Sequence, residues 1–253
     1  MEIQGKTILV TGGVSGLGKA VSTLLASMGG NVVMIDINGE KGEALAKVLK
    51  NSLFVMTDIT DNAQVKKAVD LAMEWRGRID VLVNCAGVAP GAKLVSKKGP
   101  HDLELFKKTI DINLIGPFDV MRLTAEKMTL NSPNEDGERG VIINTASGAA
   151  FEGQRGQAAY SASKAALVGM TLPLARDLMD IGIRVCSIAP GLFDTPLVAN
   201  FSDQLKAQLA QMIPFPRRLG KPPEYAMLVL HIIENSYLNG ETIRIDGALR
   251  MAP

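Results

Sequence analysis

A tyrosine and a lysine, four residues apart, are the pair in this sequence best suited to proton chemistry. Tyr160 and Lys164 lie in residues 157–179, whose apolar spacing predicts a helix, so both side chains are expected on one face of it. A free tyrosine titrates near pH ~10 and is a poor base at neutral pH. A nearby ammonium and a positively charged coenzyme ring both favour the phenolate, so we expect Lys164 and such a ring to lower the pKa of Tyr160. The pair would then exchange a proton with a substrate while a hydroxyl and a carbonyl group interconvert.

The same reaction needs a second donor to hold the substrate oxygen, and Ser147 is the candidate. Ser147 lies just beyond a predicted strand and cannot share the helix of Tyr160, but the end of an adjacent strand would bring the two together. Each of the three residues also has an ordinary alternative. In that interpretation Ser147 is a turn residue, Tyr160 a core aromatic and Lys164 a solvated charge.

Apolar strands that alternate with amphipathic helices are predicted along the whole chain. The predicted strands are residues 7–10, 31–36, 53–57, 81–84, 141–145, 183–188 and 241–245. The predicted helices are residues 16–28, 40–50, 61–75, 103–128, 157–179 and 223–233, with a shorter one at 202–212. Strands that are apolar on both faces need cover on both sides, so this alternation predicts an α/β fold with a parallel, doubly wound sheet. No linker interrupts the pattern, and we expect residues 1–253 to form a single domain.

Three glycines between the first predicted strand and the first predicted helix form a candidate phosphate-binding turn. Gly12, Gly16 and Gly18 are spaced G-x-x-x-G-x-G, which differs from the common G-x-G-x-x-G fingerprint. Glycine permits a tight turn and lets backbone N–H groups approach a pyrophosphate at the positive end of the helix. We therefore expect this turn, with Ser15 and Leu17, to bind a dinucleotide coenzyme. A tight turn with a purely structural role is the alternative.

Acidic residues after the second and third predicted strands are candidates for binding the adenosine half of that coenzyme. Asp36 ends the second strand, where a carboxylate hydrogen-bonds both ribose hydroxyls and repels a 2′-phosphate. Because Ile37 follows it instead of a basic residue, NAD is favoured over NADP. Asp58 and Ile59 follow the third strand, where they would hold the adenine. The alternative is that Asp36 is a turn or helix-capping residue and Asp58 a helix cap.

These motifs together resemble the classical short-chain dehydrogenase/reductase family, and they fall in the expected order over essentially the whole chain. They are the glycine turn, Ser147, Tyr160-x-x-x-Lys164, Asn84-Cys85-Ala86-Gly87 and Pro190-Gly191. The resemblance implies a Rossmann-like sheet of seven strands, with ligands at the carboxyl ends of the strands. It also implies coenzyme contacts at Cys85, Ala86, Gly87, Pro190, Gly191, Phe193 and Thr195.

Two further residues take their meaning from the resemblance. Asn113, in the long helix predicted at 103–128, is implied as a fourth catalytic residue, which helps hold a water that connects the lysine to solvent. Cys85 stands where the family has a second Asn. The backbone-stabilising contact that this Asn makes in the family is therefore not expected in the same form here. The chemistry of Ser147, Tyr160 and Lys164 does not depend on that contact.

Other segments resemble the subgroup of this family that acts on 3-hydroxyacyl-CoA. They are residues 144–147, 150–154, 189–193, 214–216, 238–241 and 244–248, with the insertion at 91–100 and the polar segment at 131–140. The subgroup resemblance implies reversible, NAD-dependent oxidation of short-chain 3-hydroxyacyl-CoA, including branched substrates, by a homotetramer. Steroids and other secondary alcohols are the alternative substrates.

The same resemblance implies where an acyl-CoA thioester would bind. Gln154 and Gln157 would line the acyl pocket. Residues 191–216 interrupt the alternation of strands and helices, and we expect a long insertion of this kind to form a substrate loop or lid. Lys93, Lys97 and Lys98 would meet the CoA phosphates. A solvated loop that touches no ligand is the alternative for these three lysines.

Composition and charge argue against several other classes of protein. The 253 residues carry 27 basic and 26 acidic side chains, a net charge of +1, which gives no electrostatic basis for binding nucleic acid. We expect no membrane span and no targeting segment. Cys85 and Cys186 lie in apolar runs, so we expect buried thiols in a reducing compartment, which is the cytoplasm or, in a eukaryote, the mitochondrial matrix. With only two histidines, we expect no metal site. A non-catalytic dinucleotide-binding module is a further alternative, but it would not need the Ser-Tyr-Lys set.

Overall fold

Seven parallel strands form one sheet in the order β3-β2-β1-β4-β7-β8-β9. The computed structural model describes residues 1–198 and 201–252. The strands are β1 (Thr7–Thr11), β2 (Asn31–Asp36), β3 (Ser52–Met56), β4 (Val81–Asn84), β7 (Gly140–Thr145), β8 (Ile183–Pro190) and β9 (Thr242–Ile245). The strand order reverses between β1 and β4, and that reversal is where open α/β sheets bind ligands. The predicted Rossmann-like fold is confirmed.

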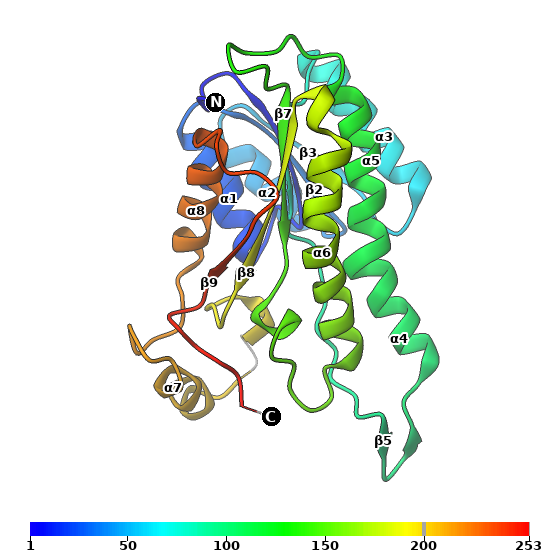
Figure 1. Ribbon diagram of the computed structural model, residues 1–253, viewed down its shortest axis with the longest axis vertical. Coiled ribbons are helices and arrows are strands. Elements are labelled where there is room, and N and C mark those ends of the chain that lie inside the picture. Colours follow the sequence, from blue (N-terminus) through cyan, green and yellow to red (C-terminus); the bar gives the residue numbers. More distant parts are fainter. Residues whose placement is uncertain (199–200, 253) are drawn as a thin grey trace.

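Helices cover both faces of the sheet (Figure 1). One face carries α1 (Gly16–Ser27), α2 (Gly39–Val48) and α8 (Pro222–Glu234), and the other carries α3 (Asn62–Arg76), α5 (Gly116–Met128) and α6 (Ala158–Asp177). Alternate strand residues feed two separate cores, because successive side chains of a strand point to opposite faces. Val32 and Met34 of β2 belong to the first core, and Val33 and Ile35 to the second.

The helix predicted at residues 103–128 contains a π turn. Helix α4 (Leu103–Ile110) continues through the π turn at Asp111–Ile115 directly into α5. Such a turn holds one extra residue and is common at functional sites. It lies beside the carboxyl end of β4, and Asn113 is at its centre.

Two segments outside the main sheet have structure of their own. The loop before α4 contains an antiparallel hairpin of β5 (Val95–Ser96) and β6 (Gly99–Pro100), which projects away from the sheet (Figure 1). Between β8 and α8 lie a 3-10 turn (Pro196–Val198) and the helix α7 (Asp203–Gln211). Residues 199 and 200 of the predicted lid lie outside the described residues.

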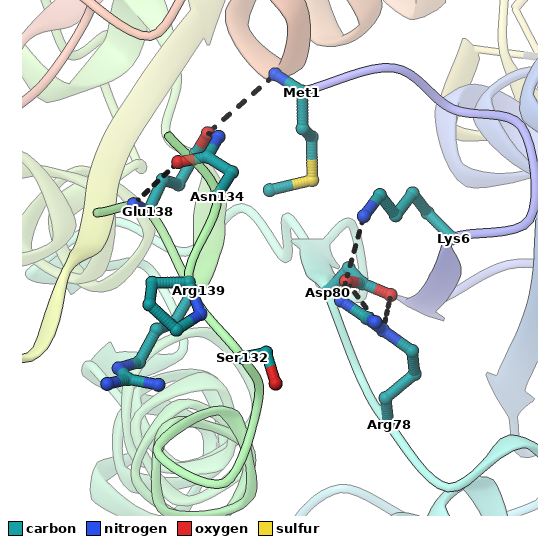
Figure 2. Close-up of a pocket in the computed structure, with 9 residues that line it drawn as sticks. Met1, Lys6, Arg78, Asp80, Ser132, Asn134, Glu138 and Arg139 are labelled. Atoms are coloured by element: carbon teal, nitrogen blue, oxygen red, sulfur yellow. Dashed lines mark hydrogen bonds and ion pairs between the residues drawn. The ribbon is translucent and has the colours of Figure 1, made fainter. Parts of the chain in front are cut away.

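Ion pairs line a small cavity at the amino-terminal ends of the sheet strands (Figure 2). Asp80 is buried and pairs with Arg78 and, at 3.8 Å, with Lys6. Glu138 and Arg184 form a second buried pair, with 2.7 Å between Glu138 Oε1 and Arg184 Nη2. These charges lie at the opposite edge of the sheet from the predicted site.

Candidate active site

Ser147, Tyr160 and Lys164 meet at the carboxyl end of β7. Ser147 begins the 3-10 turn Gly148–Ala150 that follows β7, and its Oγ accepts a hydrogen bond of 3.1 Å from the N–H of Ala149. Its hydroxyl lies beside the Tyr160 phenol. On α6, the Lys164 Nζ lies 5.9 Å from the centre of the Tyr160 ring. The predicted set is therefore assembled, with Ser147 and Lys164 buried.

Burial dominates the electrostatics of this set. Burial raises the pKa of the Tyr160 phenol, and the neighbouring Ser147 hydroxyl opposes that rise only in part. The prediction that an ammonium and a bound nicotinamide ring together lower the tyrosine pKa concerns the complex with coenzyme, and it stays a prediction. Burial also disfavours the Lys164 ammonium and lowers its pKa to about 8. Burial thus shifts the pKa of the tyrosine upward and that of the lysine downward.

Backbone carbonyls and amides hold the charged and polar groups of the site in place. The Lys164 ammonium donates to the Thr145 carbonyl at 2.7 Å. The Asn113 side chain binds the backbone of Val88 in both directions, accepting from its N–H and donating to its carbonyl, each at 2.8 Å. It also donates to Ser163 Oγ at 3.1 Å. Asn113 thus fixes the chain just after β4 to the helix that carries Tyr160 and Lys164.

The glycine turn has the close backbone approaches that a phosphate cradle needs. Gly12 has a φ of +62°, and a Cβ added there would lie 2.8 Å from the Ala86 N. A Cβ on Gly18 would lie 2.2 Å from the Gly12 carbonyl oxygen. Ser15 precedes α1 in an extended conformation, and its hydroxyl does not cap the helix. The first N–H groups of α1, close to Leu17, are the donors that a pyrophosphate requires, so these residues fit the coenzyme that the family resemblance implies.

Asp36 lies at the carboxyl end of β2. One of its carboxylate oxygens accepts a hydrogen bond of 3.0 Å from the N–H of Asn38. The cap of α2 is the Asn38 side chain, which accepts from the N–H of Lys41. The helix-cap interpretation of Asp36 is therefore wrong, whereas its role in the turn is real and leaves its second carboxylate oxygen for a ligand.

Asp58 and Ile59 follow β3 with different surroundings. Asp58 accepts from the N–H and the hydroxyl of Thr60, and the cap of α3 is Asp61, so the alternative that Asp58 is the cap is wrong. Ile59 is buried beneath α5, where a Cβ on Gly116 would lie 3.0 Å from its side chain. The Ile59 side chain is thus mostly taken up by the core.

The predicted coenzyme contacts after β4 and β8 lie around the same end of the sheet. A Cβ on Gly87 would be 3.1 Å from Asn113 Oδ1 and 3.5 Å from Lys164 Nζ. Thr195 lies against the glycine turn, because a Cβ on Gly16 would be 3.5 Å from the Thr195 Cβ. Pro190 ends β8, and Gly191 follows it.

Phe193 is the exception among these residues. Its side chain is buried in the core, edge to face with Tyr225 at 6.4 Å between ring centres. The Phe193 side chain is thus taken up by the core, and its backbone forms a β-bridge with Gly220.

The two predicted acyl-pocket glutamines are bound to each other. The Gln154 N–H donates to Gln157 Oε1 at 3.0 Å, and Gln154 Nε2 donates to the carbonyl of Ala252 at 3.0 Å. This places the carboxyl-terminal tail against the loop that leads into α6.

Tyr225 is the residue near the site that the sequence analysis missed. It lies on α8, is fully buried, and its hydroxyl is 2.7 Å from Thr145 Oγ1. Its neighbours in the sequence are mainly apolar, so a tyrosine there resembles any core aromatic. The only available signal was the missing second Asn at Cys85.

A fold with this site defines a dehydrogenase, and the comparisons agree. A model of the short chain dehydrogenase family matches residues 6–206, so the chain belongs to that family and is an oxidoreductase. The protein named 3-hydroxyacyl-CoA dehydrogenase type-2 from Bos taurus is 54% identical over 255 residues, which cover 100% of this chain and 98% of that protein. The protein of the same name from Drosophila melanogaster is 54% identical over 99% of this chain and 100% of its own. The crystal structure of 3-hydroxyacyl-CoA dehydrogenase type-2 from Mycobacterium avium has a TM-score of 0.95, with 42% identity, and the match covers 98% of this chain and 97% of that one.

Two kinds of feature are absent from the described residues. No helix within residues 1–198 and 201–252 is long and apolar enough to cross a membrane. In the same ranges no group of three or more His, Cys, Asp or Glu side chains is arranged to hold a metal ion.

Proposed function

We propose that this chain is an NAD-dependent dehydrogenase that reversibly oxidises short-chain 3-hydroxyacyl-CoA, including branched substrates, to 3-ketoacyl-CoA. The observation that carries the proposal is the assembled Ser147, Tyr160 and Lys164 set in a chain 54% identical to proteins named 3-hydroxyacyl-CoA dehydrogenase type-2. A non-catalytic binding module would need none of these three residues together at a strand end.

Each residue of the set has a distinct task in this proposal. Ser147 holds the substrate hydroxyl and Tyr160 removes its proton. Lys164 supplies the positive charge that offsets the burial of the phenolate and binds the ribose next to the nicotinamide. Asn113 holds the water that links Lys164 to solvent. NAD supplies the hydride acceptor when it is bound. Holding substrate and coenzyme in line contributes much of the rate, and proton transfer adds about 10²–10⁴-fold.

The coenzyme proposed is NAD, bound by the glycine turn, by Asp36 and by the segments after β3, β4 and β8. Asp36 supports NAD because its free carboxylate oxygen accepts from a ribose hydroxyl and repels a phosphate at the same position. Pro190, Gly191 and Thr195 would fix the carboxamide side of the nicotinamide. Asp58 would hold the adenine, with Ile59 next to it in the chain.

Asp36→Asn is expected to reduce the preference for NAD over NADP by about tenfold or more. The substitution removes the charge that repels a 2′-phosphate and keeps the shape of the side chain, so kcat/KM with NADP rises relative to NAD. Steady-state kinetics with both coenzymes measure the ratio. Asp177→Asn, at an exposed acid near the end of α6, is the matched control. Equal efficiency of the wild-type protein with both coenzymes would contradict the proposal.

The substrate class is proposed from the relatives and from the lysines of the β5–β6 hairpin. Lys97 and Lys98 are exposed at the tip of the hairpin, and Lys93 precedes it. The three lysines form a cluster of positive charge that could bind the CoA phosphates. The lid contributes exposed apolar side chains at Leu197 and Leu205. These features support a ligand with both an anionic and an apolar part.

We expect the protein to oxidise NADH with acetoacetyl-CoA far more efficiently than with free acetoacetate. The thioester carries the CoA phosphates that the hairpin lysines would bind, whereas the free acid lacks them. Absorbance at 340 nm follows the reaction, and simple ketones complete the comparison. No preference for the thioester would refute the CoA proposal. A second candidate function, oxidation of steroids or other secondary alcohols, is favoured by a relative named ipsdienol dehydrogenase from Ips pini, which is 38% identical.

A homotetramer is proposed as the working assembly. Its support is the family resemblance together with exposed apolar side chains on α4, the π turn and α5, at Leu103, Ile115 and Phe118. Analytical ultracentrifugation at assay concentrations measures the assembly, and a stable monomer would contradict it.

A further inference from the structure

A hydrogen-bonded pair links the helix α8 to the lysine of the site. Thr145 is the last residue of β7, and its backbone carbonyl accepts the 2.7 Å hydrogen bond from Lys164 Nζ. Its Oγ1 lies 2.5 Å from the Asn84 carbonyl oxygen and 2.7 Å from the Tyr225 hydroxyl. One residue thus meets the helices on opposite faces of the sheet, α6 and α8 (Figure 1).

The direction of these hydrogen bonds follows from what each group can do. A carbonyl oxygen only accepts, so the Thr145 hydroxyl donates its one hydrogen to Asn84. The Tyr225 hydroxyl is therefore the donor to Thr145. Burial raises the pKa of Tyr225 well above its usual value, so the phenol keeps the proton that it donates. Packing of Phe193 edge to face on the Tyr225 ring holds the donor in position.

Cys85 explains why this donor is needed. Cys85 Sγ is 4.0 Å from the Tyr225 hydroxyl and 3.5 Å from Thr145 Oγ1. Burial raises its pKa, so it remains a thiol, which is a weak hydrogen-bonding group compared with the amide that the family resemblance led us to expect there. The Tyr225 phenol lies next to residue 85, where the resemblance led us to expect the Asn side-chain amide.

We propose that Tyr225 is a positioning residue, which fixes Thr145 and thereby the carbonyl that holds the Lys164 ammonium. Without the Tyr225 hydroxyl, the Thr145 side chain keeps its donation to the Asn84 carbonyl and the 3.5 Å contact with Cys85 Sγ but loses its one strong donor, so the end of β7 is held less firmly beside Lys164. The buried ammonium is then less well stabilised, and so is the Tyr160 phenolate beside it. Tyr160 and Cys85 are the titratable groups that the described residues place next to Lys164. The role in catalysis rests on the proposed function, whereas the effect on Lys164 does not.

Tyr225→Phe, which removes only the hydroxyl, tests the inference by two measurements. The first is an NMR titration of protein labelled with ¹³C at the lysine ε-carbons, with the Lys164 signal assigned from Lys164→Met. The Lys164 pKa, about 8 in the wild-type protein, is expected to fall. The second is the pH profile of NAD reduction with 3-hydroxybutyryl-CoA. We expect kcat to fall about three- to tenfold and the rising limb to move to higher pH by roughly half a unit or more, the worth of one buried hydrogen bond.

Partner variants separate positioning from a loss of stability. Thr145→Val is expected to reproduce the changes of Tyr225→Phe, and the double variant should add little to either single variant. Thr145→Ser keeps the hydroxyl, so the rising limb of its pH profile should lie close to that of the wild-type protein. Tyr237→Phe, at a tyrosine that is 98% exposed, is the matched control and leaves both readouts unchanged. A lower Tm with an unmoved Lys164 pKa would overturn the inference. A shifted Lys164 pKa in a protein that does not turn over hydroxyacyl-CoA would support it and reject the proposed substrate.

Discussion

Tyr160→Phe is expected to lower kcat by about 10²–10⁴-fold while binding of NADH stays nearly intact. The substitution removes the phenolic oxygen that would take the substrate proton and leaves the ring, so the buried packing of α6 is kept. Lys164 keeps its hydrogen bond to the Thr145 carbonyl, so the ribose contact proposed for it should be kept as well. Single-turnover kinetics measure the chemical step, and quenching of protein fluorescence measures NADH binding.

The pH profile adds a sharper test of the same role. Because burial raises the pKa of Tyr160, activity of the wild-type protein in the oxidative direction should rise with pH, as the fraction of phenolate grows. A bound coenzyme, with its positive ring, and a charged Lys164 move that limb toward neutral pH. In Tyr160→Phe the limb should be absent from the residual activity. The control is Tyr237→Phe, and normal turnover by Tyr160→Phe would refute the assignment.

Glu138→Gln is expected to destabilise the protein by about 3–5 kcal/mol, because it leaves a buried guanidinium without its counter-charge. The charge belongs to Arg184, whose other N–H groups donate to the carbonyls of Ile232, Ile233 and Leu238 at 2.8–3.0 Å. Those carbonyls satisfy the hydrogen bonds but carry no full negative charge. Thermal unfolding at fixed protein concentration should show Tm lower by roughly 10 °C.

An exposed ion pair provides the matched control for this prediction. Glu104 pairs with Lys107 at 2.8 Å on α4, with side chains that are 77% and 56% exposed. Glu104→Gln removes the same charge from a solvated site and should cost less than about 1 kcal/mol. Equal losses of stability in the two variants would show that burial of the Glu138–Arg184 pair does not matter.

Much of the fold was predictable from the sequence, since apolar runs of strand length alternate with helical periodicity. Two strands, Asn31–Asp36 and Val81–Asn84, were predicted at their exact bounds because a polar residue ends each apolar run. The β5–β6 hairpin was missed, because strands of two exposed residues have no buried face to mark them. The π turn was missed because one extra residue barely changes the apolar pattern of a long helix.

The candidate site was predictable where topology alone brings residues together. Ser147 and Tyr160 meet because Ser147 follows the carboxyl end of β7 and Tyr160 lies in the first turn of α6, the helix that begins at the same end of the sheet. Tyr225 was not predictable, since its partner Thr145 is 80 residues away and its own surroundings are apolar. The contribution of burial, which raises the pKa of Tyr160, was not predictable, because a sequence does not display burial.

The π turn at Asp111–Ile115 makes this stretch of chain sensitive to its length more than to its composition. Each residue of a helix turns the following side chains by about 100°. Because the π turn already absorbs one extra residue, deleting one residue here would turn it into an ordinary α-helical turn and keep α4 and α5 in register on either side. A natural or engineered chain that lost this single residue would therefore keep its hairpin in place but lose the wide turn that carries Asn113, and with it the paired contact between Asn113 and the Val88 backbone.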